Sequence, residues 1–372
     1  MPTLLGITNG SDKKLKIFRN IDRFLITLIV SLLIIGLITL FSASQQNISL
    51  LVMQLINISL GIIFLIFLSN INPKQFVFFA PHIYLLSVFL LISVSFFGFE
   101  SHGAKRWINL FIFNLQPSEV IKITIPLMLA WVYHRFQNTI NYKIHLMAFF
   151  ILATPCLIVF KQPDLGTSIL IFLSGFTIIF LAGLSLKFIL ASIISFLVSI
   201  PYLWSTLHLY QQNRILSLFD PGRDPFGTGY HSMQSMIAIG SGGLLGKGWS
   251  YGSQTQLNFL PETTTDFIFS VYGEEFGFIG VIGILIIYFV LLYRCIDIAI
   301  KMQDTFSRLI TAALAFALFS SSIVNIAMVS GLLPIVGAPL PFISYGGTSM
   351  VVSLGMIGII MSLNSNKSLI AN

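Results

Sequence analysis

Ten long apolar stretches dominate this sequence and decide in which solvent the chain can fold. An α-helix needs about 20 mainly apolar residues to cross the hydrocarbon core of a bilayer. Such stretches lie near 24–43, 50–69, 76–97, 117–134, 145–160, 165–183, 187–205, 266–293, 308–331 and 343–363. Membrane β-barrels use short segments of alternating polarity instead. The pattern therefore predicts an all-α polytopic membrane protein with about ten transmembrane helices, in a single domain over residues 1–372.

The scarcity of charge excludes a water-soluble fold. Hydrophobic residues make up 56% of the chain and charged residues 9%, whereas a soluble domain carries about 25% charged residues. Too few polar side chains are present to cover the outside of a soluble protein of this size. Lipid must therefore be the main solvent.

The distribution of basic residues predicts the orientation in the membrane. An even number of spans places both termini on one side. With the N-terminal segment 1–23 in the cytoplasm, 13 of the 20 Lys and Arg residues fall on the cytoplasmic side, as the positive-inside rule requires. The net charge of +7 is then a signal of topology, and we expect no nucleic-acid partner.

One long polar segment, residues 206–265, is predicted to form a large extracytoplasmic loop. Unstructured connections of this length are uncommon and usually functional. The loop carries Arg223 in DPGRDPFG and Lys247 in GGLLGKGW. Either cation could meet an anionic group such as a phosphate. The alternatives are a local salt bridge for Arg223 and a tightly turned surface loop around Lys247, whose spacing does not match a nucleotide-binding phosphate loop.

The motif NFLPETTTDFIFSVYGEEFGFIG opens the eighth span and places Asp266 at its start. Thr263 and Asp266 have the spacing of a capping box, so the acid could simply stabilise the helix N-terminus. Alternatively, Asp266 could be a general base at the membrane surface, kept ionised by the helix dipole. The residues alone leave both interpretations open.

Small residues and two acids follow Asp266 along the same span. Ser270, Gly273, Gly277 and Gly280 are three or four residues apart, which predicts close approach of a neighbouring helix. Glu274 and Glu275 are acids within the span, so at least one of them needs a partner or must face water. We expect either a structural role or a place in a polar cavity.

Three further charged groups map to the same predicted external face. Lys105 and Arg106 follow the third span, and Asp164 is placed to cap the sixth. Glu119 and Lys122 have i, i+3 spacing in the fourth span and are predicted to pair, either structurally or in a polar cavity.

Six motifs give the chain a strong family resemblance along nearly its whole length. They are GAKRW from Gly103, QPSE from Gln116, QPDLGTS from Gln162, GYHSMQSMIAIGSGGLLGKG from Gly229, FLPETTTDFIFSVYGEEFG from Phe259 and PLPFISYGGTSM from Pro339. With them the chain resembles the SEDS (shape, elongation, division and sporulation) proteins. The run GSQTQLNFLPE before Asp266 is more similar to the elongation branch than to the division branch.

The resemblance implies a ten-helix peptidoglycan glycosyltransferase that polymerises lipid II on the outer face of the cytoplasmic membrane. It implies that Asp266 is the catalytic base, and that Glu119, Lys122 and Asp164 line the cavity. Similar proteins often carry His two residues before the acid, where this chain has Thr264. An accessory role for such a His is therefore absent here.

The resemblance also implies partners. These are lipid II as substrate, a class B penicillin-binding protein acting as transpeptidase, and proteins of the elongation complex. The pyrophosphate of lipid II would need cations, for which we expect Lys105, Arg106, Lys122, Arg223 and Lys247, with a divalent ion such as Mg or Mn as a further candidate. Two other functions remain open: a lipid II flippase, or a non-catalytic activator of the transpeptidase.

Overall fold

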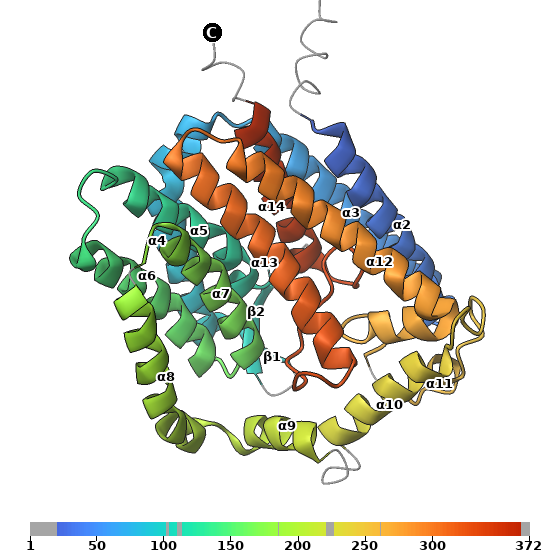
Figure 1. Ribbon diagram of the computed structural model, residues 1–372. Coiled ribbons are helices and arrows are strands. Elements are labelled where there is room, and N and C mark those ends of the chain that lie inside the picture. The colour runs from blue at the N-terminus through green and yellow to red at the C-terminus, as the bar shows by residue number, and fades with distance from the viewer. Residues whose placement is uncertain are drawn as a thin grey trace, which may run out of the picture.

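The computed structural model describes residues 21–101, 104–109, 114–184, 186–220, 227–260 and 262–365 (Figure 1). Within these ranges a long helix lies at each of the ten predicted spans. The helices are α2 (Arg23–Ala43), α3 (Ile48–Ser69), α4 (Pro73–Phe97), α5 (Pro117–Arg135), α6 (Tyr142–Lys161), α7 (Leu165–Leu181), α8 (Leu186–Thr206), α12 (Ile268–Ile300), α13 (Thr305–Val329) and α14 (Gly347–Ser365). By length and composition, seven of them are able to cross a membrane, and α7 is apolar but shorter. The chain is a helical, polytopic integral membrane protein.

The remaining elements gather at one end of the helix bundle (Figure 1). Three short helices, α9 (Leu209–Phe219), α10 (Thr228–Ser241) and α11 (Ser253–Gln256), lie within the predicted large loop. An antiparallel sheet in the order β1-β2-β3 joins α4 to α5 and consists of β1 (Phe99–Ser101), β2 (Ala104–Asn109) and β3 (Asn114–Leu115). The hydropathy pattern did not predict these strands, because they are too short to show an alternation.

The centre of the bundle is formed by α5, α13 and α14, which are buried along most of their length. Close backbone approach is part of this packing: a Cβ added to Gly358 of α14 would lie 2.6 Å from the carbonyl oxygen of Leu65 in α3. A larger residue at position 358 would push the two helices apart. The centre therefore consists of tightly packed small and aliphatic side chains.

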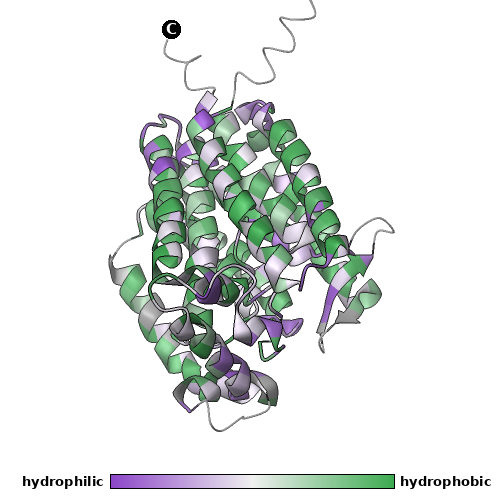
Figure 2. Ribbon diagram, turned by 90° about the vertical axis from the view of Figure 1, so that its right-hand side faces the viewer, coloured by the Kyte–Doolittle hydropathy of each residue, from purple (hydrophilic) through white to green (hydrophobic). Residues whose placement is uncertain are grey.

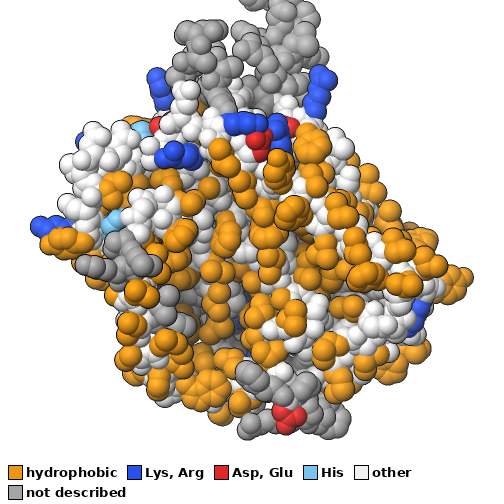
Figure 3. Space-filling model, viewed as in Figure 1, with side chains coloured by type: hydrophobic (Ala, Val, Ile, Leu, Met, Phe, Trp, Pro, Cys, Tyr) orange, Lys and Arg blue, Asp and Glu red, His pale blue; other side chains and the backbone are white. Residues whose placement is uncertain are grey.

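The outside of the bundle is a wide apolar belt (Figures 2 and 3). It consists largely of exposed Phe, Leu and Ile side chains from the outer helices, such as Phe67, Phe89 and Phe289. Large exposed apolar surfaces of this kind are unusual on soluble proteins. The belt is the surface that lipid covers.

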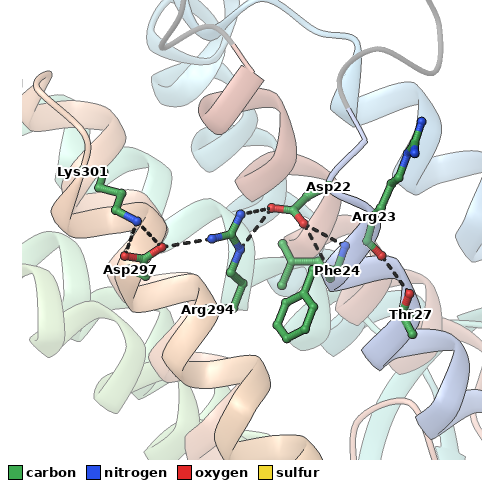
Figure 4. Close-up of polar contacts among 8 residues, drawn as sticks. Asp22, Arg23, Phe24, Thr27, Arg294, Asp297 and Lys301 are labelled. Atoms are coloured by element: carbon green, nitrogen blue, oxygen red, sulfur yellow. Dashed lines mark hydrogen bonds and ion pairs between the residues drawn. The ribbon is translucent and has the colours of Figure 1, made fainter.

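The described ends of the chain lie together at the end of the bundle opposite the sheet, where charged side chains collect (Figures 1 and 3). There Arg294 of α12 binds Asp22 (Nη2–Oδ2, 2.7 Å) and Asp297 (Nη1–Oδ2, 3.0 Å), and Lys301 binds Asp297 (Figure 4). Asp22 also caps α2 by accepting from Phe24 N at 3.0 Å. This network fixes α2 against α12. Most of the predicted N-terminal segment, residues 1–20, lies outside the described residues.

Candidate active site

Asp266 lies in the turn that leads into α12, and this turn is fixed by the segment that precedes α14. Asn325 of α13 donates from Nδ2 to the carbonyl oxygens of Asp266 (2.9 Å) and Ala338 (2.6 Å). Ser344 Oγ donates to the carbonyl oxygen of Thr265 at 2.7 Å. Two segments that are far apart in the sequence therefore hold the backbone on which the carboxylate is mounted.

The predicted capping box does not form, because α12 begins at Ile268 with Phe267 as its N-cap and no side-chain capping bond. The surroundings of Asp266 raise its pKa, whereas a helix dipole was expected to favour the ionised form. The pKa of Asp266 is raised to about 6, mainly by burial and next by the negative charge of Glu262, while Arg214 opposes the rise. The carboxyl group is still mainly ionised at pH 7, and its pKa lies close to the value that suits a general base.

Two guanidinium groups and a second acid lie near enough to Asp266 to act on it electrostatically. Asp164 caps α7 by accepting from Thr167 N at 3.1 Å, as predicted, and its Oδ2 lies 3.6 Å from Arg106 Nε. Arg106, Asp164 and Arg214 all act electrostatically on Asp266. The three side chains come from β2, α7 and α9 and thus from three separate parts of the chain.

A pocket of about 340 Å³ adjoins these charges. Its lining consists of Arg106, Pro163, Asp164, Leu165, Gly166, Gln211, Arg214, Ile215, Pro334, Ile335 and Val336. The next residue, Gly337, has φ 70°, and a Cβ added there would lie 3.2 Å from Asp266 Oδ2. The wall of the pocket thus continues directly to the carboxylate. The sequence did not single out Arg214, Gln211 or Asn325; the one available signal was the position of Arg214 and Gln211 in the polar loop.

The other predicted cations are distributed differently. Lys105 is exposed on β2 beside Arg106, and Arg223 lies outside the described residues. Lys247 is drawn inward: its Nζ lies 2.7 Å from Oε1 of Glu274, an acid with no exposed surface. The position of Lys247 therefore indicates a counter-ion for Glu274 rather than a substrate contact.

The predicted pair of Glu119 and Lys122 is confirmed. Lys122 Nζ donates to Glu119 Oε1 at 2.6 Å, and both side chains are buried in α5. The pair lines an internal pocket with residues of α13 and α14 and of the 339–344 segment, including Ser321 and Ser353. The partner of the last acid, Glu275, is Ser42 Oγ, which donates to its Oε1. Each acid within the bundle thus has a polar partner.

A metal site made by protein side chains alone does not occur in the described part of the chain. No group of three or more His, Cys, Asp or Glu side chains there is close enough to hold an ion. The carboxylates of Asp266, Asp164 and Glu262 influence one another electrostatically. They could share an ion only if another ligand contributed oxygens.

Comparison with known proteins places the chain in a family. A family model described as cell cycle protein, covering FtsW, RodA and SpoVE, matches residues 22–369. The chain is 42% identical to the peptidoglycan glycosyltransferase MrdB of Escherichia coli K12 over 353 residues, which covers 95% of both chains. It is 35% identical to MrdB of Helicobacter pylori, with 94% of this chain and 91% of the relative covered.

Solved structures share the fold. A chain of a peptidoglycan synthase complex superposes with a TM-score of 0.81 and 26% identity, covering 93% of this chain and 98% of that one. The rod shape-determining protein RodA of Thermus thermophilus gives a TM-score of 0.72 and 25% identity, with coverage of 93% and 97%. The match over nearly the full length, in sequence and in structure, shows that the chain belongs to the SEDS family of FtsW, RodA and SpoVE proteins.

Proposed function

We propose that this chain is a peptidoglycan glycosyltransferase that joins lipid II disaccharide units into glycan strands, with Asp266 as the catalytic base, for cell elongation and rod shape. Relatives that match nearly the whole chain carry this enzymatic activity in their names. The observation that carries the assignment of the base is the position of Asp266: a rigidly held carboxylate with a pKa of about 6, beside Arg106 and Arg214. A carboxylate and two cations at one site suit an inverting transfer from a pyrophosphate donor.

The reaction needs one proton acceptor and one stabilised leaving group. The 4-hydroxyl of the acceptor GlcNAc attacks C1 of the donor MurNAc, and the bond between C1 and the pyrophosphate oxygen breaks. Asp266 takes the hydroxyl proton during the attack, because a sugar hydroxyl is too weakly acidic to ionise beforehand. The α-linkage becomes β in a single displacement, which requires no covalent intermediate on the protein.

The leaving polyprenyl pyrophosphate gains negative charge as the bond breaks. Arg106 and Arg214, which line the pocket next to Asp266, are the cations best placed to stabilise that charge. Lys105 and Arg223 remain candidates from the sequence for contacts further out. Mg or Mn is typically held by one or two carboxylates together with phosphate oxygens. Asp164 together with the substrate pyrophosphate would fit such an ion, which would add positive charge at the leaving group and leave Asp266 free to accept the proton.

The charged residues support a location of this site on the extracytoplasmic face. Basic side chains such as Lys74, Arg135 and Arg308 lie at the starts or ends of helices at the end of the bundle that also holds Arg23 and Ser365. The positive-inside rule assigns that end, and with it both termini, to the cytoplasm. The Asp266 end then faces outward, and the polyprenyl tail of lipid II stays in the bilayer.

The partner we expect is a class B penicillin-binding protein that crosslinks the strands as they form, within the elongation complex. Support comes from the structural similarity to a chain of a peptidoglycan synthase complex in which polymerization and crosslinking are coordinated.

The decisive experiment compares three forms of the protein, purified in detergent with a transpeptidase partner and given labelled lipid II. The unmodified chain should yield glycan strands. Asp266→Asn should abolish them, and Asp220→Asn, the same change at an exposed acid outside the pocket, should not. A flippase would move lipid II across vesicle membranes without polymer. A non-catalytic activator would raise crosslinking by the transpeptidase equally in the unmodified chain and in Asp266→Asn. Transport of lipid II without polymer, or activation that does not depend on Asp266, would reject the proposal.

A further inference from the structure

The turn after α10, residues 242–252, packs against α12 where that helix is broken. Gly277 has φ 65° and ψ −166°, which interrupts the helical hydrogen bonds. The backbone of the turn replaces them from Lys247 N to Glu274 O (3.0 Å), from Gly248 N to Glu275 O (3.0 Å), from Phe278 N to Gly243 O (2.9 Å) and from Ile279 N to Leu244 O (3.2 Å). Only glycine fits at the closest point, since a Cβ on Gly246 would lie 2.1 Å from the carbonyl oxygen of Glu275.

The length of α12 fixes the depth of this turn in the membrane. At the cytoplasmic end, the first charged residue of α12 is Arg294, in the network of Figure 4. Residues 278–293 contain no charge and rise by about 24 Å as an α-helix. The hydrocarbon core of a bilayer is about 30 Å thick. The turn beside Gly277 therefore lies at or just inside the opposite edge of the apolar core.

The contact of the turn with a second helix, α2, independently indicates a similar depth of the turn in the membrane. Trp249 of the turn donates from Nε1 to the carbonyl oxygen of Ile38 in α2 at 3.2 Å, and its ring stacks on Phe41 with centroids 6.1 Å apart. Residues 24–38 rise by about 22 Å from Arg23 at the cytoplasmic end of α2. Tryptophan commonly lies at the edge of the membrane.

The outer surface of the turn is apolar and continuous with the lipid-facing belt. Leu244 is 70% exposed and Leu245 is 79% exposed, while the adjoining Phe278 and Ile279 of α12 are 56% and 60% exposed. The only charged residue in 242–252 is Lys247, and its ammonium group points inward to Glu274. A surface of this composition is suited to acyl chains rather than to water.

We propose that the 242–252 turn is inserted into the outer leaflet, with Leu244 and Leu245 among the acyl chains and Trp249 and Tyr251 near the headgroups. Irregular backbone is tolerated at this depth when its polar groups are paired, and the hydrogen bonds to α12 supply that pairing. The predicted large loop is thus not entirely outside the membrane. Its middle is a lipid anchor that positions α10 and α11 on the bilayer surface.

The test measures where single positions lie in vesicles of phosphatidylethanolamine and phosphatidylglycerol. A spin label is attached at Leu245→Cys, at Phe289→Cys in the lipid-facing middle of α12, and at Lys105→Cys on β2. The native cysteines, Cys156 and Cys295, are buried, and the unsubstituted chain serves as the labelling control. Collisions with oxygen report lipid, and collisions with a water-soluble nickel chelate report solvent.

We expect the ratio of oxygen to nickel collisions at Leu245 to be similar to that at Phe289 and well above that at Lys105. A ratio at Leu245 equal to that at Lys105 would overturn the proposal, and so would protection from both reagents, which indicates protein contact. Quenching by brominated acyl chains provides a label-free check. Trp249→Phe should remove a large share of the quenchable fluorescence, and an unchanged quenched fraction would contradict the insertion.

Discussion

Two substitutions near Asp266 should move the acid side of the pH–activity profile in opposite directions. The pKa of Asp266 is raised to about 6 by burial first and by Glu262 second, and it is lowered by Arg214. Glu262→Gln removes a negative charge and should lower that pKa, whereas Arg214→Gln removes a positive charge and should raise it. The Glu262 change also keeps an oxygen for the hydrogen bond from Thr265 Oγ1, which is 2.8 Å long.

The size of both effects follows from simple electrostatics. With a pKa of about 6, about ten in eleven Asp266 side chains are ionised at pH 7 and about one in eleven at pH 5, so activity should fall about tenfold between these values. Two charges 4 Å apart in water interact with about 1 kcal/mol, and one pKa unit corresponds to 1.36 kcal/mol. Each substitution should therefore shift the acid limb by up to about 0.7 pH unit.

The assay is kcat/KM for polymerisation of labelled lipid II between pH 4.5 and 8, because its pH dependence reports groups of the free enzyme. Each variant is compared with the unmodified chain on the same substrate, so that titration of lipid II itself cancels. Asp220→Asn, which removes an exposed charge that does not act on Asp266, should leave the limb in place. Shifts in the same direction for both variants, or a limb centred near pH 4, would refute the assignment of Asp266 as the titrating base.

Four further substitutions test the framework around the site. Asp266→Asn should stabilise the protein by up to about 3 kcal/mol at pH 7, because ionising a group whose pKa is raised by about two units in the folded state opposes folding. This gain in stability should vanish below pH 4. Thermal unfolding in detergent at both pH values measures it. Lys247→Met should destabilise it by about 3 kcal/mol because Glu274 is left as a buried charge without a cation, and adding Glu274→Gln should restore most of that loss in the same measurement. Asn325→Ala removes two hydrogen bonds that hold the Asp266 turn and should lower the free energy of unfolding by about 2 kcal/mol. It should also lower kcat for polymerisation more than it changes KM. A fall in stability with unchanged kcat would show that Asn325 does not position the base. Gly277→Ala should prevent stable folding, since Cβ would lie 2.3 Å from Gly246 N, whereas Gly283→Ala, with open space around it, should be tolerated when expression and size-exclusion profiles are compared.

Much of the fold could be predicted from local features of the sequence. The positions of the ten long helices follow from hydropathy, because each helix must supply its own backbone hydrogen bonds and apolar surface in lipid. The pairing of Glu119 with Lys122 and the cap at Asp164 also depend on residues three apart, so periodicity is enough to predict them. The small-residue stripe in α12 correctly indicated a neighbouring helix at Gly273, where α10 packs, but the neighbour at Gly277 is the 242–252 turn and Gly280 faces only side chains of α12 itself.

Contacts between distant segments decided the rest, because hydropathy and spacing carry no information about which segments meet. Arg214 acts on Asp266 from α9, and Asn325 fixes the same turn from α13, while Lys247 is paired with the buried Glu274. Burial by these neighbours raises the pKa of Asp266 although its position near a helix start predicted the opposite. The sequence thus determined the helices and the identity of the central acid, and the tertiary structure alone determined that acid's electrostatic environment, since desolvation and charge depend on everything packed around a group.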